Sequence, residues 1–233
     1  MHSVTNPLQA CNDIFFKPNG VFKAVGENNN WSWLPFILLV VALILPQYLY
    51  VNAVDIDWLA NSIVSAQEAM SPAEEDAMRS FITRKSLIIQ ATVGTFIGLV
   101  IFNAIFAVYF NLATRNDDSH VFGFTDWYGF TLWTAMPSVL SCLLGVIALL
   151  LSDGHQIPQS TVFPTSLAFL LNIDMASEWF AFCQAVKLEL IWSIYLTMVG
   201  ISQWTSFSTK KSLLIAIAPS VVIYGIWLLV ILL

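Results

Sequence analysis

Five long stretches of the chain contain no Asp, Glu, Lys or Arg, and this feature limits the possible folds most. They are Leu34–Val54, Leu87–Phe110, Trp127–Leu151, Leu190–Thr209 and Ser212–Leu233. Each is long enough to cross the hydrocarbon core of a membrane as a helix, which takes roughly 20 apolar residues. Only 10% of the 233 residues are charged, whereas soluble domains usually have about 25%. The sequence therefore predicts an all-α membrane protein.

The predicted architecture is a bundle of five transmembrane helices with an N-terminal amphipathic helix pair. The membrane domain is expected to cover residues 34–233, and residues 1–33 are expected to form an amphipathic interfacial segment. The five spans are predicted at about 34–54, 87–110, 130–151, 188–207 and 213–233.

The N-terminal segment contains the signals of two short helices. Asn6 can cap a helix that starts with Pro7, and the first helix should stop at Lys17 because Pro18 follows it. A second helix can start at Pro18 and end at Gly26. The apolar faces of this pair either lie in the membrane interface or pack on the rim of the helix bundle, and the sequence leaves both open.

Three further features of the chain predict local structure. Ser71-Pro72 followed by two glutamates is typical of a helix start, so a short extramembrane helix is expected there. Gly94 and Gly98 form a GxxxG pair, which predicts close helix packing, either within the chain or between two copies. The apolar stretch Phe163–Leu171 is too short to span, so we expect a re-entrant or interfacial helix.

Charge and motifs exclude several functional classes. The formal net charge of −6 leaves no basic patch for phosphates, which argues against nucleic-acid binding and leaves membrane lipids as the expected surroundings. No catalytic motif of the G-x-S-x-G, H-E-x-x-H or Walker type occurs, so we predict no catalytic residue and no cofactor. Asp117, Asp118 and His120 share one loop, but a solvated turn is the better interpretation than a metal site.

Polar residues in or near the predicted spans are candidate functional residues. Lys187 and Glu189 lie at the start of the fourth predicted span, where they either face a cavity or reach the membrane interface. Two residues apart on a helix, they are not expected to pair with each other. Asn103 and Ser138 could hydrogen-bond between helices or line a polar path.

The distribution of basic residues gives the orientation. Lys210 and Lys211 lie in a short loop, and the excess of Lys and Arg in cytoplasmic loops favours a cytoplasmic N-terminus.

Four stretches, taken together and in order, resemble one known family. They are IFFKPNGVFKAV (14–25), AMPSVLSCLLG (135–145), FPTSLAFLL (163–171) and LELIWSIYLTMVGISQWTSFSTKKSLLIAIAP (188–219). This pattern is similar to that of the Yip1 family of integral membrane proteins, in its bacterial branch. The residues that carry the resemblance are Phe15, Phe16, Pro18, Phe22, Pro137, Glu189, Trp192, Gly200, Lys210 and Lys211. The loop at 116–120 departs from the pattern, because the family has a glycine-rich turn there.

The resemblance implies a five-helix domain with a cytoplasmic N-terminus, in the bacterial inner membrane. The eukaryotic members bind Rab GTPases, but they carry a longer hydrophilic N-terminal region, so that role is not transferred. The family has no established catalytic residues.

The sequence supports two main functional hypotheses. In the first, the protein is a non-enzymatic scaffold or adaptor that organises an unidentified membrane-protein partner or lipids. The candidate interaction residues are Phe15, Phe16, Pro18, Phe22, Gly94, Gly98, Pro137, Lys187, Glu189 and Trp192. In the second, it is a small transporter, channel or lipid-handling protein acting as a homo-oligomer. A membrane enzyme is a third and weaker hypothesis, because no ionisable residues converge in the sequence.

Overall fold

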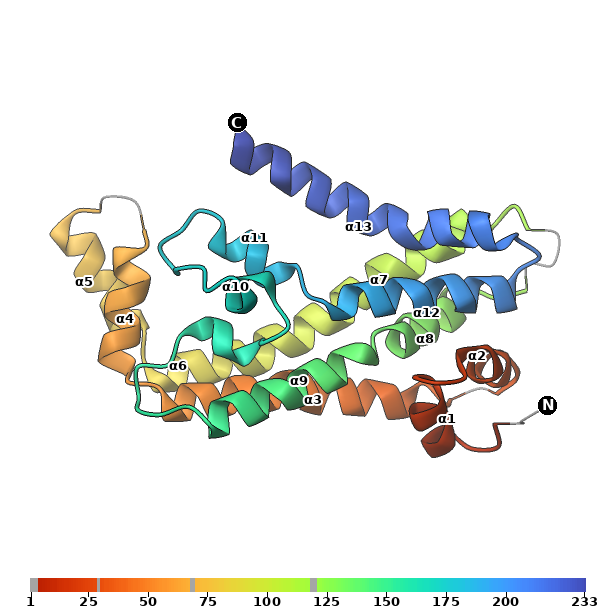
Figure 1. The fold of residues 1–233 in the computed structure, drawn as a ribbon, viewed down its shortest axis with the longest axis horizontal. Coiled ribbons are helices and arrows are strands. Elements are labelled where there is room, and N and C mark those ends of the chain that lie inside the picture. Colours follow the sequence, from red (N-terminus) through yellow and green to blue (C-terminus); the bar gives the residue numbers. More distant parts are fainter. Residues whose placement is uncertain (1–3, 29, 68–69, 118–120) are drawn as a thin grey trace. The chain divides into compact units, whose positions relative to one another are not determined.

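Helices make up most of the part of the chain that the computed structural model describes, residues 4–28, 30–67, 70–117 and 121–233 (Figure 1). These residues form no strand, only one isolated antiparallel bridge between Ser166 and Lys187. Four helical segments are long and apolar enough to cross a membrane: Trp33–Ala53, Arg84–Ala113, Phe124–Leu150 and Thr209–Leu232. The protein is therefore a multi-pass helical membrane protein.

The fourth of the five predicted spans forms a shorter helix than expected. This helix, α12, covers Glu189–Trp204 and has 16 residues. At about 1.5 Å per residue it extends about 24 Å, which is less than the roughly 30 Å hydrocarbon core. It begins at Glu189, one residue after the predicted start, and ends at Trp204, three residues before the predicted end at 207. Just before it begins, the backbone N–H of Leu188 donates to the carbonyl of Thr165 at 3.0 Å in an extended pairing.

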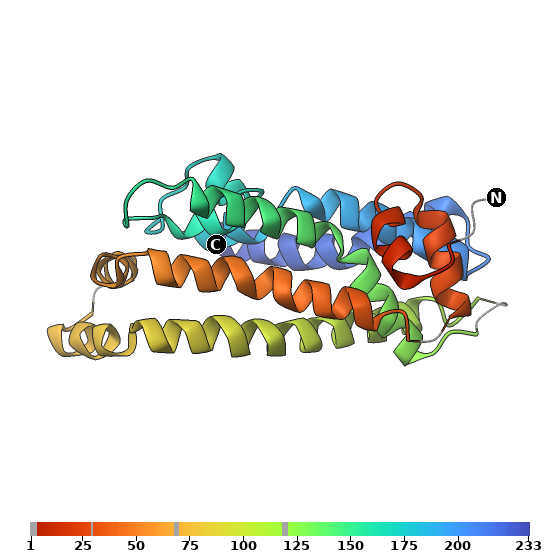
Figure 2. The same ribbon diagram turned by 90° about the horizontal axis from the view of Figure 1, so that it is seen from below.

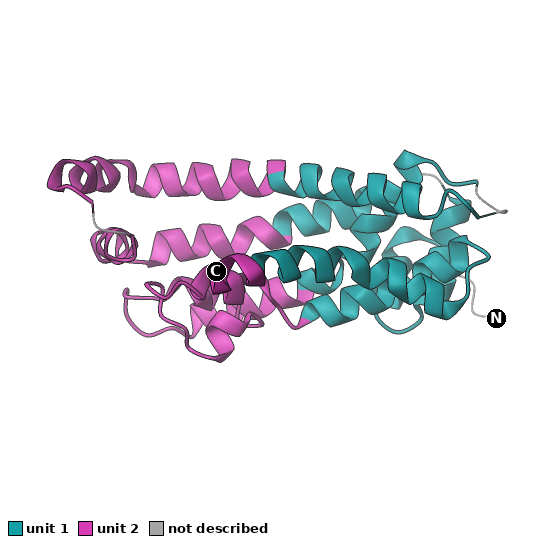
Figure 3. Ribbon diagram, turned by 90° about the horizontal axis from the view of Figure 1, so that it is seen from above, with its two compact units in different colours: residues 1–41, 98–139, 189–227 teal, residues 42–97, 140–188, 228–233 magenta. Residues whose placement is uncertain are grey.

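The chain forms two compact units, which are described separately (Figure 3). Unit 1 comprises residues 1–41, 98–139 and 189–227, and unit 2 comprises residues 42–97, 140–188 and 228–233. The boundaries fall inside four helices: α3 (Trp33–Ala53), α7 (Thr95–Ala113), α9 (Pro137–Leu150) and α13 (Thr209–Leu232).

The N-terminal segment of unit 1 forms α1 (Pro7–Asp13) and α2 (Pro18–Glu27). The side chain of Asn6 caps α1 by accepting a hydrogen bond from the Gln9 backbone at 2.8 Å. Helix α2 packs against α12, and the two lie side by side in both views (Figures 1 and 2). Of the two placements left open by the sequence, the structure has α2 packed on the other helices of unit 1.

Unit 1 also contains α8 (Phe124–Thr134), which is separated from α9 by Ala135 and Met136. The interruption follows from Pro137, because proline has no N–H and its ring clashes with the carbonyl four residues earlier. Pro137 is buried and becomes the first residue of α9.

Unit 2 contains three helices between α3 and α7. They are α4 (Ile56–Ser65), α5 (Pro72–Phe81) and α6 (Arg84–Ile89). Helix α5 begins with a capping box of Ser71 and Glu74, at the start that the sequence predicts. A single π-helical segment, Gln90–Gly94, joins α6 to α7 without interrupting the long helix.

The connection between α9 and α12 contains only short helices. They are a 3₁₀ segment at Gln159–Val162, α10 (Leu167–Leu170) and α11 (Phe180–Ala185). The helix expected over 163–171 is reduced to α10, because Ser166 caps it only at Leu167. It ends before Asn172, whose φ of 51° is left-handed.

Candidate functional site

The packing of α2 against α8 and α12 depends on one aromatic contact and one glycine. Phe22 of α2 is 0% exposed, and its ring centroid lies 5.2 Å from that of Phe130 in α8. Gly200 of α12 faces both rings: a Cβ there would lie 2.3 Å from Phe130 Cε2 and 2.9 Å from Phe22 Cδ1. Only a residue without a side chain lets α12 approach this closely.

Further aromatic rings extend this contact into a cluster. The ring centroid of Trp204 lies 5.2 Å from that of Trp127 and 5.1 Å from that of Phe130. The Trp204 indole Nε1–H donates to the carbonyl of Phe22 at 2.8 Å, so the last residue of α12 holds the backbone of α2. We call Phe22, Phe110, Trp127, Phe130 and Trp204 the aromatic cluster.

The other N-terminal candidate residues divide into buried and exposed ones. Phe15 packs edge-on against Trp192 of α12 with centroids 5.4 Å apart, which brings together two residues singled out from the sequence. Pro18 is buried at the start of α2. Phe16 is 75% exposed, and Leu8 on α1 is 72% exposed. The segment is therefore anchored by Phe15 and Phe22 and presents Phe16 and Leu8 outward.

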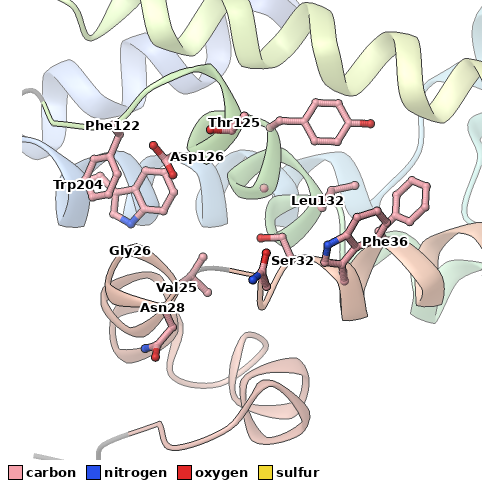
Figure 4. Close-up of a pocket in the computed structure, with 14 residues that line it drawn as sticks. Val25, Gly26, Asn28, Ser32, Phe36, Phe122, Thr125, Asp126, Leu132 and Trp204 are labelled. Carbon is pink, nitrogen blue, oxygen red and sulfur yellow. The ribbon is translucent and has the colours of Figure 1, made fainter.

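A cavity of about 610 Å³ lies beside the aromatic cluster in unit 1 (Figure 4). Asp126 lies close to the Phe122 and Trp204 rings, while Phe36 lies on the other side of the cavity (Figure 4). The remaining wall combines polar, small and apolar residues from the end of α2, the segment that leads into α3, the start of α3 and the first turns of α8. They are Val25, Gly26, Asn28, Asn30, Ser32, Trp33, Thr125, Tyr128, Gly129 and Leu132.

A smaller cavity of about 230 Å³, also in unit 1, brings together Asn103 of α7 and Ser138 of α9. Asn103 Nδ2 donates to the carbonyl of Leu99 at 2.6 Å, within its own helix. Thr197 of α12 also lines this cavity, and its hydroxyl donates to the carbonyl of Ser193 at 2.7 Å. These donors bond to carbonyls of their own helices, and the described contacts contain no hydrogen bond between Asn103 and Ser138. The surface of the cavity is mainly apolar, with polar side chains among the apolar ones.

Lys187 and Glu189 lie in different surroundings. The ammonium group of Lys187 lies 3.7 Å from the centroid of the Phe163 ring within unit 2, a cation–π contact. Glu189 begins α12 in unit 1, and its buried Oε2 has no hydrogen-bond partner among the described residues.

The GxxxG pair is open in the described structure. A Cβ added at Gly94 or at Gly98 would meet no atom within 4 Å. Close packing within the chain therefore does not involve this pair, and contact with a second copy remains a prediction.

The loop considered as a weak metal candidate is used for packing. Asp117 is buried, and its Oδ1 and Oδ2 accept hydrogen bonds from the Ser206 backbone N–H at 3.1 and 3.2 Å. Asp118 and His120 lie outside the described residues. Within the described ranges, no group of three or more His, Cys, Asp and Glu side chains could hold a metal ion.

Most of the aromatic cluster is not apparent from the sequence. Phe110, Trp127, Phe130 and Trp204 fall within apolar stretches, and apolar composition does not distinguish core-facing rings from lipid-facing ones. A usable signal was present in Gly129 and Gly200. A Cβ at Gly129 would lie 2.5 Å from Ser32 Oγ, so both glycines mark close approaches of helices.

Several apolar helices long enough to span, together with a packed N-terminal segment, define a multi-pass helical membrane protein. The comparisons identify the family: a model of the Yip1 domain matches residues 12–232. The chain belongs to the Yip1 family, as the resemblance in the sequence indicated. That family is not known as enzymatic. No curated protein and no solved structure matches the chain.

Proposed function

We propose that the protein is a non-enzymatic adaptor of the Yip1 type in the bacterial inner membrane. Its N-terminal segment would bind a partner membrane protein. The observation that carries this proposal is the exposure of Phe16 and Leu8, at 75% and 72%, on a segment that Phe22 anchors firmly. Exposed large apolar side chains on a fixed frame are typical of an interaction surface.

In this proposal, the phenylalanines that pack on other helices hold the segment in place and the exposed one binds the partner. Phe22 and Phe15 hold the segment, so their loss would disturb the fold itself. Phe16 is 75% exposed, so its replacement would affect the binding of a partner and not the packing of the segment.

The test compares two exposed phenylalanines after extraction of the protein with its surrounding lipid and without detergent. Phe16→Ser should lower the amount of co-purified partner protein, as measured by native mass spectrometry. Phe81→Ser is the matched control, because Phe81 is 76% exposed on a different helix, α5. Equal partner recovery from both variants would contradict the proposal.

The smaller cavity favours a second candidate, a small transporter or lipid-handling protein acting as an oligomer, because polar side chains lie within its mainly apolar lining. Asn103, Ser138 and Thr197 are among these polar side chains. Under this candidate, native mass spectrometry would find a homo-oligomer that carries a small molecule and no partner protein.

We further propose five crossings with the N-terminus in the cytoplasm, α12 being the fourth. The contact between Asp117 and Ser206 supports this count. Asp117 lies between the spans Arg84–Ala113 and Phe124–Leu150, and Ser206 lies between α12 and α13. Two loops in contact lie on one side of the membrane, so the chain that leaves this side along Phe124–Leu150 must return before Ser206. Helix α12 is the segment that leads back.

Reporter fusions at the C-terminus test this topology. Five crossings place the C-terminus outside, so alkaline phosphatase fused after Leu233 should be active and green fluorescent protein should stay dark. The reverse pattern would contradict the combination of five crossings with a cytoplasmic N-terminus.

A further inference from the structure

We infer that the cavity beside the aromatic cluster binds the ammonium group of an amine-bearing phospholipid headgroup. The inference does not depend on the adaptor proposal, since it concerns a different surface from Phe16 and Leu8. The cavity volume of about 610 Å³ falls within the roughly 300–1,000 Å³ of small-molecule sites.

The charge of the lining selects a cation. Asp126 is the only charged side chain among the described residues that line the cavity. Its Oδ2 accepts a hydrogen bond from the Gly123 backbone N–H at 2.8 Å, which fixes the carboxylate at the start of α8. A carboxylate has capacity for several hydrogen bonds, so it can still accept one from a ligand.

The hydrogen-bond donors of the lining are partly used by the protein. Trp204 Nε1–H donates to the Phe22 carbonyl, and Asn28 Nδ2 donates to the Ala24 carbonyl, both at 2.8 Å. The hydroxyl groups of Ser32, Thr125 and Tyr128 also line the cavity and can both donate and accept, so the charge of the described lining comes from Asp126 alone. An anionic ligand would meet Asp126 with little to compensate, whereas an ammonium group would meet it favourably.

Two aromatic rings form one wall of the cavity. Phe122 and Trp204 stack with centroids 4.2 Å apart and planes 19° apart, and both line the cavity beside Asp126 (Figure 4). Gly26 lies close to this pair, since a Cβ there would lie 3.1 Å from both Phe122 Cζ and Trp204 Nε1. Trp204 is only 5% exposed and packs on other rings, so the pair offers the headgroup an apolar wall beside the carboxylate.

The position of the cavity along the helices indicates a lipid as the source of the ammonium group. Two candidate spans begin at the cavity: Trp33 and Phe36 come from the first turn of the first span, and Thr125 and Asp126 from the first turn of the third. The ends of spans lie at the depth of the lipid headgroups, where tryptophan is enriched. Asn28 and Trp33 are exposed, so the cavity is open to a ligand from that level.

The test reconstitutes the full chain in nanodiscs of equal parts phosphatidylethanolamine, phosphatidylcholine and phosphatidylglycerol. Native mass spectrometry then measures which lipid is retained. We expect phosphatidylethanolamine to be enriched about tenfold over phosphatidylglycerol, as expected for a charge-assisted hydrogen bond. Phosphatidylcholine should be intermediate, because its quaternary ammonium cannot donate a hydrogen bond to Asp126.

Two variants and one control connect the binding to this cavity. Asp126→Asn removes the charge and keeps the shape, and Thr125→Lys adds an opposing charge while leaving the Asp126 cap intact. Both should abolish the enrichment. Asp57→Asn, which removes a first-turn carboxylate that does not line the cavity, should retain it.

Three outcomes would overturn the inference. They are no preference among the lipids, the same preference in Asp126→Asn and Thr125→Lys as in the unaltered chain, or Asp126-dependent binding of free ethanolamine or spermidine without any lipid preference. The last outcome would assign the cavity to a soluble amine.

Discussion

Unit 1 and unit 2 are both helical, but different interactions hold them together. Unit 1 is centred on aromatic rings that come from segments far apart in the sequence, with Phe22, Phe110, Phe130 and Trp204 in contact. The core of unit 2 is mainly aliphatic, with Val51, Leu59, Leu149, Ile157 and Val162 buried together. Beside this core, side chains donate hydrogen bonds to the backbone carbonyls at the end of α3.

This difference predicts which kind of substitution destabilises each unit. Aromatic packing at Gly200 leaves no space, so unit 1 should be sensitive to side-chain volume. In unit 2, Arg84 donates through both Nη atoms to the carbonyls of Val51 and Val54, and the hydroxyl of Tyr50 donates to the carbonyl of Ile157 at 3.2 Å. Unit 2 should therefore be sensitive to the loss of hydrogen-bond donors.

The largest expected effect is from Phe22→Ala. Removing this fully buried ring should lower the free energy of unfolding of unit 1 by about 3–5 kcal/mol, through lost burial and a residual cavity. Hydrogen exchange should show loss of protection in α2 and α12, while α4 and α5 remain protected. Phe16→Ala, at an exposed position, should change protection by less than about 0.5 kcal/mol.

A smaller effect is expected from Gly200→Ala. The added methyl group would overlap the Phe130 ring, so we expect a loss of about 1–3 kcal/mol from overpacking. Gly225→Ala in α13 is the matched control, since a Cβ there meets no atom within 4 Å. In thermal unfolding, the control should be neutral or slightly stabilising because alanine favours helix. Equal effects at the two glycines would show that α12 and α2 are not in close contact.

For unit 2, Arg84→Met removes the donors at the end of α3 and keeps much of the side-chain length. The expected loss is about 1–3 kcal/mol, because buried carbonyls lose their partners. Arg79→Met is the control: Arg79 forms a surface pair with Glu75 at 4.0 Å, and such pairs contribute about 0–1 kcal/mol. Loss of protection in α2 rather than at the end of α3 would contradict the division between the units.

The smallest expected effect is on the rate at which the thiol of Cys11 reacts. Burial raises the pKa of Cys11 in α1 to about 11. At pH 8 its thiolate fraction is therefore about 100-fold lower than that of an exposed thiol with a pKa near 8.5–9. Alkylation monitored by mass spectrometry should be slow at pH 8 and accelerate as the pH rises towards 11. A Phe16→Cys variant provides the exposed reference, and similar rates at the two positions would contradict the packing of α1.

The sequence was sufficient to predict the helical membrane class, because charge-free stretches have few alternatives. The starts of α1, α2 and α5 were also predictable, since Asn6, Pro18 and Ser71 act through neighbours in the sequence. The short α12 was not, because both of its ends adjoin contacts with distant residues: Leu188 pairs with Thr165 before it, and Ser206 donates to Asp117 after it.

The candidate site was predictable only in part, because its contacts join residues that lie far apart in the sequence. Phe15, Phe22 and Trp192 are among the residues that carry the family resemblance in the sequence, but the contacts they make depend on tertiary packing. The cavity beside Asp126 was not anticipated at all. Its walls come from segments more than 90 residues apart, such as Ser32 and Asp126, and only the fold brings them together.

The adaptor proposal is tested most directly by photo-crosslinking in intact membranes. A photoreactive phenylalanine analogue is placed at position 16, and the same analogue at position 81 serves as the reference. The account predicts one discrete protein–protein adduct from position 16 and none from position 81. Adducts with lipid alone at position 16, or the same pattern at both positions, would contradict the claim that the anchored N-terminal segment presents Phe16 to a partner protein.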